Sequence, residues 1–154
     1  FVCENNLYSV YTPLSERQPK RQLTELARAH EMPSVVADGN DIAAVFRSTQ
    51  EAVARARQGG GPTFLVFDTY RWREHCGPGF DNHLGYRTEA EYQSWRLRCP
   101  IELHREDLLR KSFLTQEDEE ALVADLKLEI DAAFDFARAA PLPDPSQVAA
   151  HVYA

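Results

Sequence analysis

The segment from Gly61 to Thr88 is the feature that most constrains the fold of this chain. Residues 63–67 form an apolar, β-favouring run that is entered from Gly and Pro. At Asp68 the sequence becomes polar and continues into an irregular segment that contains three Gly, one Pro and two His. A strand that delivers charged and aromatic groups into a loop at its carboxyl end is typical of the ligand-binding edge of an open α/β sheet. We therefore expect functional residues at this edge.

Two more strands are predicted before this segment. Residues 1–4 and 34–37 have the apolar character of short buried strands. The Asn5-Asn6 pair predicts the turn after the first of them, because Asn tolerates a left-handed backbone. The interval from Leu7 to Pro19 is predicted to be irregular, and residues 23–30 to form a short helix.

The helix from Asp41 to Gln58 is the clearest element of the sequence. Its apolar residues recur near helical spacing, and three consecutive glycines, residues 59–61, end it. Because a strand precedes it and another follows, the order favours a parallel pair with a right-handed crossover. The predicted fold class is α/β, with part of a parallel sheet, flanking helices and a helical carboxyl-terminal segment.

Three helices are predicted in that carboxyl-terminal part. Thr88 caps a helix at 89–96, a second covers 101–111, and a capping box at Thr115 opens the longest, which runs to about Arg138. Apolar residues step by four along this last helix, which predicts one buried face. The stripe consists of Leu122, Leu126, Ile130 and Phe134.

Composition excludes several classes of function. The 154 residues suit a single domain, and the net charge of −7, with no stripe of Lys and Arg, argues against a nucleic-acid partner. No apolar run approaches the length of a membrane span, so no membrane partner is expected. Three Cys, an odd number without zinc spacing, and the lack of a leader pattern favour a cytoplasmic location.

The chain begins in the middle of a strand pattern, at Phe1-Val2-Cys3. A sheet strand at the very start implies that preceding elements of the domain are missing. We therefore expect residues 1–154 to be part of a larger domain that another polypeptide completes.

The Asn5-Asn6 turn is the first candidate site. A side-chain oxygen of Asn6 and the main-chain carbonyl of Tyr8 can both face one hard cation, and Mg²⁺ prefers such oxygen ligands. Two neutral oxygens alone would not hold it, so a carboxylate and a phosphate must come from elsewhere. The simpler alternative is an ordinary turn at a strand end.

His75 is the second candidate. It follows the strand end closely, beside Arg71, Arg73 and Glu74, where an imidazole can hydrogen-bond a phosphate or transfer a proton near neutral pH. The alternative is an exposed loop histidine. A nucleophilic pair with Cys76 is not expected, because adjacent residues of an extended loop point apart.

The remaining aromatic and histidine residues are interpreted as structural. Trp72 and Trp95 are expected to be packing anchors. The other histidines show no pattern of partners and are interpreted as structural or exposed: His30, His83, His104 and His151.

Four motifs in order resemble a known family. They are CENNLYSVYTP, ADGNDIAAV, GPTFLVFDTYRW followed by His75, and GYRTEAEYQSWRLRCPI, with a final HVYA. Together they resemble the α subunit of thiamine-diphosphate-dependent 2-oxo acid dehydrogenases, the first component of the pyruvate and branched-chain enzymes. The resemblance covers nearly the whole chain and corresponds to the carboxyl-terminal half of such a subunit.

The resemblance implies roles for the candidate residues. In this family a Gly-Asp-Gly motif and an Asn-Asn motif hold the diphosphate of the cofactor through Mg²⁺. Asn6 then supplies the side-chain ligand and Tyr8 the carbonyl, while His75 contacts the diphosphate side and assists catalysis. The implied cofactors are thiamine diphosphate and Mg²⁺. The implied partners are an amino-terminal fragment that carries Gly-Asp-Gly and a β-type subunit that binds the pyrimidine half.

The chain departs from the family pattern in its loop. The usual His-Gly-His-Ser is replaced by Arg73-Glu74-His75-Cys76, which leaves substrate and acceptor open and removes the serine that is phosphorylated in mitochondrial members. The leading hypothesis is a subunit active only as an assembly, with oxidative decarboxylation of a 2-oxo acid as the default reaction. Two alternatives are a transketolase-like two-carbon transfer to an aldehyde and a non-catalytic scaffold.

Overall fold

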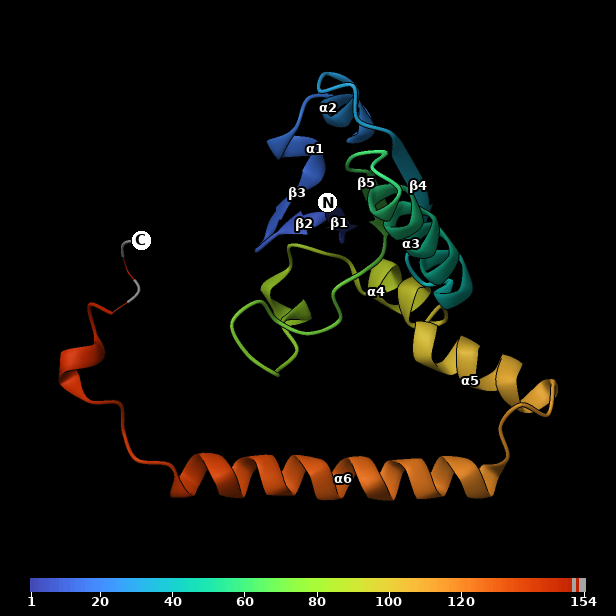
Figure 1. The fold of residues 1–154 in the computed structure, drawn as a ribbon. Helices are drawn as coiled ribbons and strands as arrows, with labels where there is room; N and C mark the ends of the chain where they lie inside the picture. Colours follow the sequence, from blue (N-terminus) through green and yellow to red (C-terminus); the bar gives the residue numbers. More distant parts are fainter. Residues whose placement is uncertain (151, 153–154) are drawn as a thin grey trace. The chain divides into compact units, whose positions relative to one another are not determined.

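A computed structural model of the chain describes residues 1–150 and 152, in two compact units. Unit 1 comprises residues 1–107 and unit 2 residues 108–154, and each is considered by itself. His151, Tyr153 and Ala154 lie outside the described residues, and with them most of the final HVYA motif. Figure 1 gives the order of the elements along the chain.

Unit 1 is built on a parallel sheet of three strands. The strand order is β1-β5-β4, with β1 at Val2–Asn5, β5 at Phe64–Asp68 and β4 at Ser34–Asp38. The central strand is the apolar run of the sequence, and its residues Leu65, Val66 and Phe67 are buried. The parallel pairing of β4 with β5 confirms the predicted parallel pair.

The crossover is made by α3, Ile42–Arg57, which lies beside β4 and β5 (Figure 1). The Asp41 side chain caps its first turn by accepting a hydrogen bond from Ala44 N. Past Gln58, Gly59 takes a φ of 77°, a conformation that glycine adopts without strain. The preceding helix, α2 at Thr24–Arg28, also contacts both strands and is shorter than predicted.

The interval from Leu7 to Pro19 is more regular than predicted. It contains a hairpin, β2 at Tyr8–Ser9 and β3 at Thr12–Pro13, and then α1 at Leu14–Arg17. The prediction of a left-handed Asn was also wrong, because Leu7 and Val10 take the positive φ values, 71° and 55°. Asn5 remains extended since it still pairs with β5, so the turn begins later.

Beyond the loop that follows β5, the helices start where the sequence predicts. After the 3₁₀ turn η1, Asn82–Leu84, Thr88 caps α4, Glu89–Arg96, by accepting from Glu91 N. The next helix, α5, spans Pro100–Arg110. Asn40 Nδ2 donates to the carbonyl of Arg98 at 2.8 Å, which attaches the end of α4 to the sheet.

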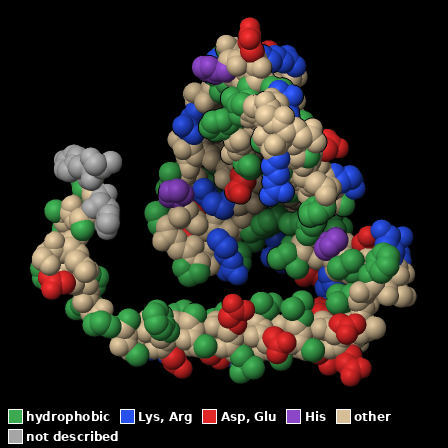
Figure 2. All heavy atoms as spheres, viewed as in Figure 1, with side chains coloured by type: hydrophobic (Ala, Val, Ile, Leu, Met, Phe, Trp, Pro, Cys, Tyr) green, Lys and Arg blue, Asp and Glu red, His purple; other side chains and the backbone are tan. Residues whose placement is uncertain are grey.

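Unit 2 contains the long helix α6, Gln116–Ala139, and the 3₁₀ turn η2, Pro145–Gln147. The predicted capping box is present between Thr115 and Asp118. The prediction of a buried face was wrong, because all four stripe residues are about half exposed. Within this unit η2 is one short turn and does not cover a stripe that extends over most of a 24-residue helix. Apolar and acidic side chains both line α6 (Figure 2).

Among the described residues, no helix combines the length and the apolar character needed to cross a lipid bilayer.

Candidate functional site

The carboxyl ends of the three strands lie side by side and are tied together. Asn5, Asp68 and Asp38 are paired residues of the register. The Asn5 amide donates to the Asp68 carboxylate at 2.7 Å, and Gly39 N donates to the carbonyl of Asp68 at 2.8 Å. Because all three strands end at one level, the segments that follow them leave the sheet at the same edge.

Asn6 follows β1 at this edge and is joined to Tyr8. The Asn6 side-chain oxygen accepts from Tyr8 N at 3.1 Å. Leu14 N donates to the Leu7 carbonyl, and hydrogen-bonded pairs alternate along an antiparallel hairpin, so the next pair, Tyr8 with Pro13, is a non-hydrogen-bonded one. The Tyr8 N–H and carbonyl therefore point away from β3. The N–H and C=O of one strand residue point to the same side, so this carbonyl lies on the side of the Asn6 oxygen.

A cavity of about 190 Å³ opens beside these two residues. Its walls come from the end of β1, the hairpin and the α1 region: Cys3, Glu4, Asn5, Asn6, Leu7, Tyr8, Ser9, Leu14, Arg17, Gln18 and Leu23. A second cavity of about 390 Å³ shares Asn5, Leu14 and Leu23 with it and reaches Asp68 and Arg21. The predicted edge of the sheet is therefore hollowed where Asn6 and Tyr8 lie.

The Tyr8 side chain connects the hairpin to α4. Its hydroxyl lies 2.9 Å from both carboxylate oxygens of Glu91, and its ring meets that of Tyr86 edge-on at 5.3 Å. Burial, together with the hydrogen bond and the charge of Glu91, raises the pKa of Tyr8 to about 12. The phenol therefore stays protonated and donates to Glu91 throughout the physiological range.

The base of the loop after β5 is closed by a buried ion pair. The Arg87 guanidinium lies 2.7 Å from the Asp81 carboxylate, and both side chains are 1% exposed. Arg87 also donates to the carbonyls of Arg71 and Trp72, so it joins the two ends of the loop. Tyr86 donates its hydroxyl to the same carboxylate at 3.0 Å.

The tip of the loop has its own contacts. Glu74 N donates to the carbonyl of Gly79 at 3.0 Å, and Gly79 N donates to the Glu74 carboxylate at 3.2 Å. Arg73 donates to the carbonyl of Pro78 at 2.8 Å. These bonds close a short ring of chain, with His75 exposed on it.

The structure brings two of the three predicted site residues together. Asn6 and Tyr8 line one cavity, whereas His75 lies on the loop tip and is not on the wall of that cavity as the structure describes it. The loop is nevertheless attached to the hairpin, because Arg71 donates to the carbonyl of Val10 at 2.8 Å. The Asp81–Arg87 pair was missed, although opposite charges on either side of a glycine turn offered a signal.

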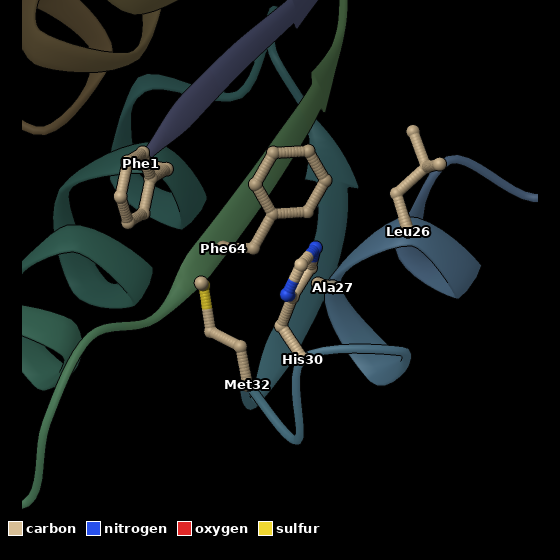
Figure 3. Close-up of a pocket in the computed structure, with 6 residues that line it drawn as sticks. All are labelled: Phe1, Leu26, Ala27, His30, Met32 and Phe64. Atoms are coloured by element: carbon tan, nitrogen blue, oxygen red, sulfur yellow. The ribbon is translucent and has the colours of Figure 1, made fainter.

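A separate apolar cavity of about 390 Å³ lies at the other end of the sheet, where β5 begins (Figure 3). Its walls are Phe1, Leu26, Ala27, His30, Met32 and Phe64. Apart from the exposed His30 these side chains are apolar, which does not suit a charged cofactor.

The aromatic anchors are confirmed. Trp95 stacks on Tyr70 with centroids 5.4 Å apart, and Trp72 meets the same ring edge-on. The cysteines are unpaired: Cys3, Cys76 and Cys99.

Comparison with known proteins identifies the family. The Dehydrogenase E1 component family is matched over residues 1–146, nearly the whole chain. The chain belongs to this family. Its membership confirms the resemblance drawn from the four motifs, and the parallel sheet with flanking helices agrees with the predicted α/β class.

Relatives of this E1 chain carry α-subunit names. The pyruvate dehydrogenase E1 component subunit alpha of Staphylococcus aureus is 35% identical over 133 residues, which are 86% of this chain and 36% of the relative. The 2-oxoisovalerate dehydrogenase subunit alpha of Bacillus subtilis is 29% identical over 154 residues, all of this chain and 46% of the relative. This E1 chain thus spans less than half the length of these relatives.

Proposed function

We propose that this chain is part of an α-type subunit of a thiamine-diphosphate-dependent enzyme that oxidatively decarboxylates a 2-oxo acid. Family membership and the names of the relatives support the enzyme class. The observation that carries the proposal is the contact of Asn6 with Tyr8 on the wall of one cavity, in which the Asn6 side-chain oxygen accepts from Tyr8 N.

Asn6 and Tyr8 are the residues that hold the metal. Both offer hard, neutral oxygens, which is the donor type Mg²⁺ takes from proteins. The Tyr8 carbonyl belongs to a non-hydrogen-bonded pair of the hairpin and points away from β3, and the Asn6 oxygen retains acceptor capacity beyond its one bond. These donors fit Mg²⁺ as part of a set, with a carboxylate from a Gly-Asp-Gly segment and phosphate oxygens completing it.

His75 is the residue of this chain that moves a proton or holds a phosphate. Its imidazole is exposed on a loop whose base is closed by buried Arg87 and Asp81. Because the base of the loop is fixed, the loop tip has fewer accessible positions. The His75 imidazole is therefore held close to one position. When bound, thiamine diphosphate supplies the chemistry that cleaves a carbon–carbon bond beside a carbonyl.

The proposed assembly needs at least two further components. One carries Gly-Asp-Gly and completes the domain of which residues 1–154 form the carboxyl-terminal half. The other is a β-type subunit that binds the pyrimidine half of the cofactor. A reducing compartment such as the cytoplasm suits the three unpaired cysteines.

A second candidate is a transketolase-like transfer of a two-carbon unit to an aldehyde. The observation that favours it is the altered loop, in which Arg73 and Glu74 precede His75 and both are engaged within the loop. Product analysis with a lipoyl acceptor and with an aldehyde acceptor separates the two reactions. A non-catalytic scaffold would use neither acceptor.

The metal assignment is tested with Asn6→Ala in the assembly of this chain with its co-purifying partners. Mg²⁺ is titrated at fixed thiamine diphosphate, and cofactor binding is followed by calorimetry. We expect Asn6→Ala to weaken Mg²⁺-dependent binding at least tenfold, while the exposed control Gln50→Ala behaves as wild type. Unchanged binding in Asn6→Ala would show that Asn6 is not a ligand.

A further inference from the structure

We propose that Arg17 binds a phosphate group of the anionic cofactor, in the cavity that holds Asn6 and Tyr8. This inference rests on the proposed function and adds to it a cationic contact that the family motifs do not assign. It concerns the diphosphate end of the cofactor, because the cavity lies at the predicted metal ligands.

The position of Arg17 carries the inference. Arg17 is the last residue of α1, and it lines the same 190 Å³ cavity as Asn6, Tyr8 and Ser9. The residues of this cavity therefore combine two neutral oxygens that can bind a metal with a hydroxyl group and a guanidinium group. A phosphate held by a metal at Asn6 has further oxygens, and these need donors of their own.

The hairpin fixes where α1 begins. Leu14 N donates to the carbonyl of Leu7 at 2.7 Å, so the first residue of α1 is bonded to the residue that follows Asn6. Gln18 N donates to the carbonyl of Leu14 at 2.9 Å and closes the turn that contains Arg17. Arg17 is thus held near Asn6 by main-chain bonds, although eleven positions separate them in the sequence.

The Arg17 side chain is also available. It is exposed, and among the described residues it forms no ion pair or side-chain hydrogen bond. Other arginines of this region are engaged: Arg71 with Val10 and Tyr86, Arg87 with Asp81, and Arg21 with Gln18. Arg17 therefore has its donors free for a ligand.

The charge of Arg17 offsets a negative charge on the wall of the cavity. Glu4 lines the same cavity, and its carboxylate repels a phosphate. Without Arg17 the charge on these walls would be negative, the wrong sign for a diphosphate. A guanidinium offsets Glu4, and its planar fork of N–H groups matches two phosphate oxygens at once.

The test compares Arg17→Gln, Arg17→Lys and a control, Arg28→Gln, in the assembly with its co-purifying partners. Arg28 is exposed in the last turn of α2 and does not line the cavity. Binding of thiamine diphosphate and of thiamine, which has no phosphate, is measured by calorimetry with Mg²⁺ present. Salt dependence is recorded for each variant.

We expect Arg17→Gln to weaken thiamine diphosphate binding by about 10- to 100-fold, the effect of one charge-assisted hydrogen bond. Thiamine binding stays unchanged, Arg17→Lys restores part of the loss, and Arg28→Gln behaves as wild type. A weaker salt dependence in Arg17→Gln marks the lost charge.

Two other outcomes distinguish a failure of the Arg17 assignment from a failure of the proposed function. If wild type binds the cofactor and Arg17→Gln binds it equally well, Arg17 is not a phosphate ligand, while the proposed function stands. If the wild-type assembly binds no thiamine diphosphate with Mg²⁺, the proposed function fails and this inference with it.

Discussion

The Asp81 carboxylate and the Arg87 guanidinium lie 2.7 Å apart, and each side chain is 1% exposed. If either of two buried, oppositely charged side chains is removed, the other remains desolvated with no opposite charge to offset the free-energy cost. Arg87 also donates to the carbonyls of Arg71 and Trp72 and to the side-chain oxygen of Asn82. The Asp81–Arg87 pair therefore closes the base of the loop on which His75 lies.

Asp81→Asn should destabilise unit 1 by about 3 kcal/mol, because it leaves the Arg87 charge buried and unpaired. Urea unfolding measures the loss, and limited proteolysis should show faster cleavage within residues 73–80. Asp135→Asn is the control, since it removes an exposed ion pair with Arg138 and should leave stability unchanged. Equal stability of the two variants would mean that the buried pair does not hold the loop.

His75→Ala should reduce turnover of the assembly by about 100-fold, the lower end of what a general acid or base contributes, without loss of stability. Stability should be kept because His75 is exposed on the loop tip. Turnover and urea unfolding are measured on the same preparation. The neighbouring Cys76→Ser serves as control. A variant that unfolds readily but keeps its turnover per folded molecule would make His75 structural.

Tyr8 should make stability depend on pH above 10. Burial and the bond to Glu91 raise its pKa in the folded chain from the ordinary value of 10.0 to about 12. The unfolded phenol ionises first as pH rises, so the stabilisation is complete below pH 10 and is lost between about 10 and 12. Wild type should lose unfolding free energy over this range more steeply than Tyr8→Phe. Parallel curves for the two proteins would contradict the assigned contact.

Gly39→Ala should disturb the carboxyl edge of the sheet. A Cβ at this position would lie 3.0 Å from the Asp68 carbonyl oxygen and 3.0 Å from Thr69 Cβ. We expect a loss of about 1–2 kcal/mol, because neither the backbone nor the β-branched side chain can move away freely. Urea unfolding measures this cost. A variant as stable as wild type would show that the carboxyl edge of the sheet accommodates the added methyl group.

The sequence predicts the parts of this fold that depend on local signals. Asp41, Thr88 and Thr115 mark helix starts within one residue, because a side-chain cap acts on the turn next to it. The hairpin after Asn6 was missed, since its strands are two residues long and carry no alternation. Its turns also use Leu7 and Val10 at positive φ, which residue preferences disfavour.

Longer-range features were harder to predict. The stripe along α6 has the period of a buried face, but a periodic pattern does not specify what covers it, and in unit 2 it is exposed. The proposed ligands Asn6 and Tyr8 were predicted from the turn at the end of the first strand and from the family resemblance, not from periodicity. Arg17 had no motif, and only the folded hairpin brings it to the same cavity.

The most direct measurement is a titration of thiamine diphosphate onto the chain with its co-purifying partners, with Mg²⁺ and with a chelator. We predict saturable binding that requires Mg²⁺. Binding that is absent, or that persists unchanged in the chelator, would contradict the claim that Asn6 and Tyr8 form part of a Mg²⁺ site for this cofactor.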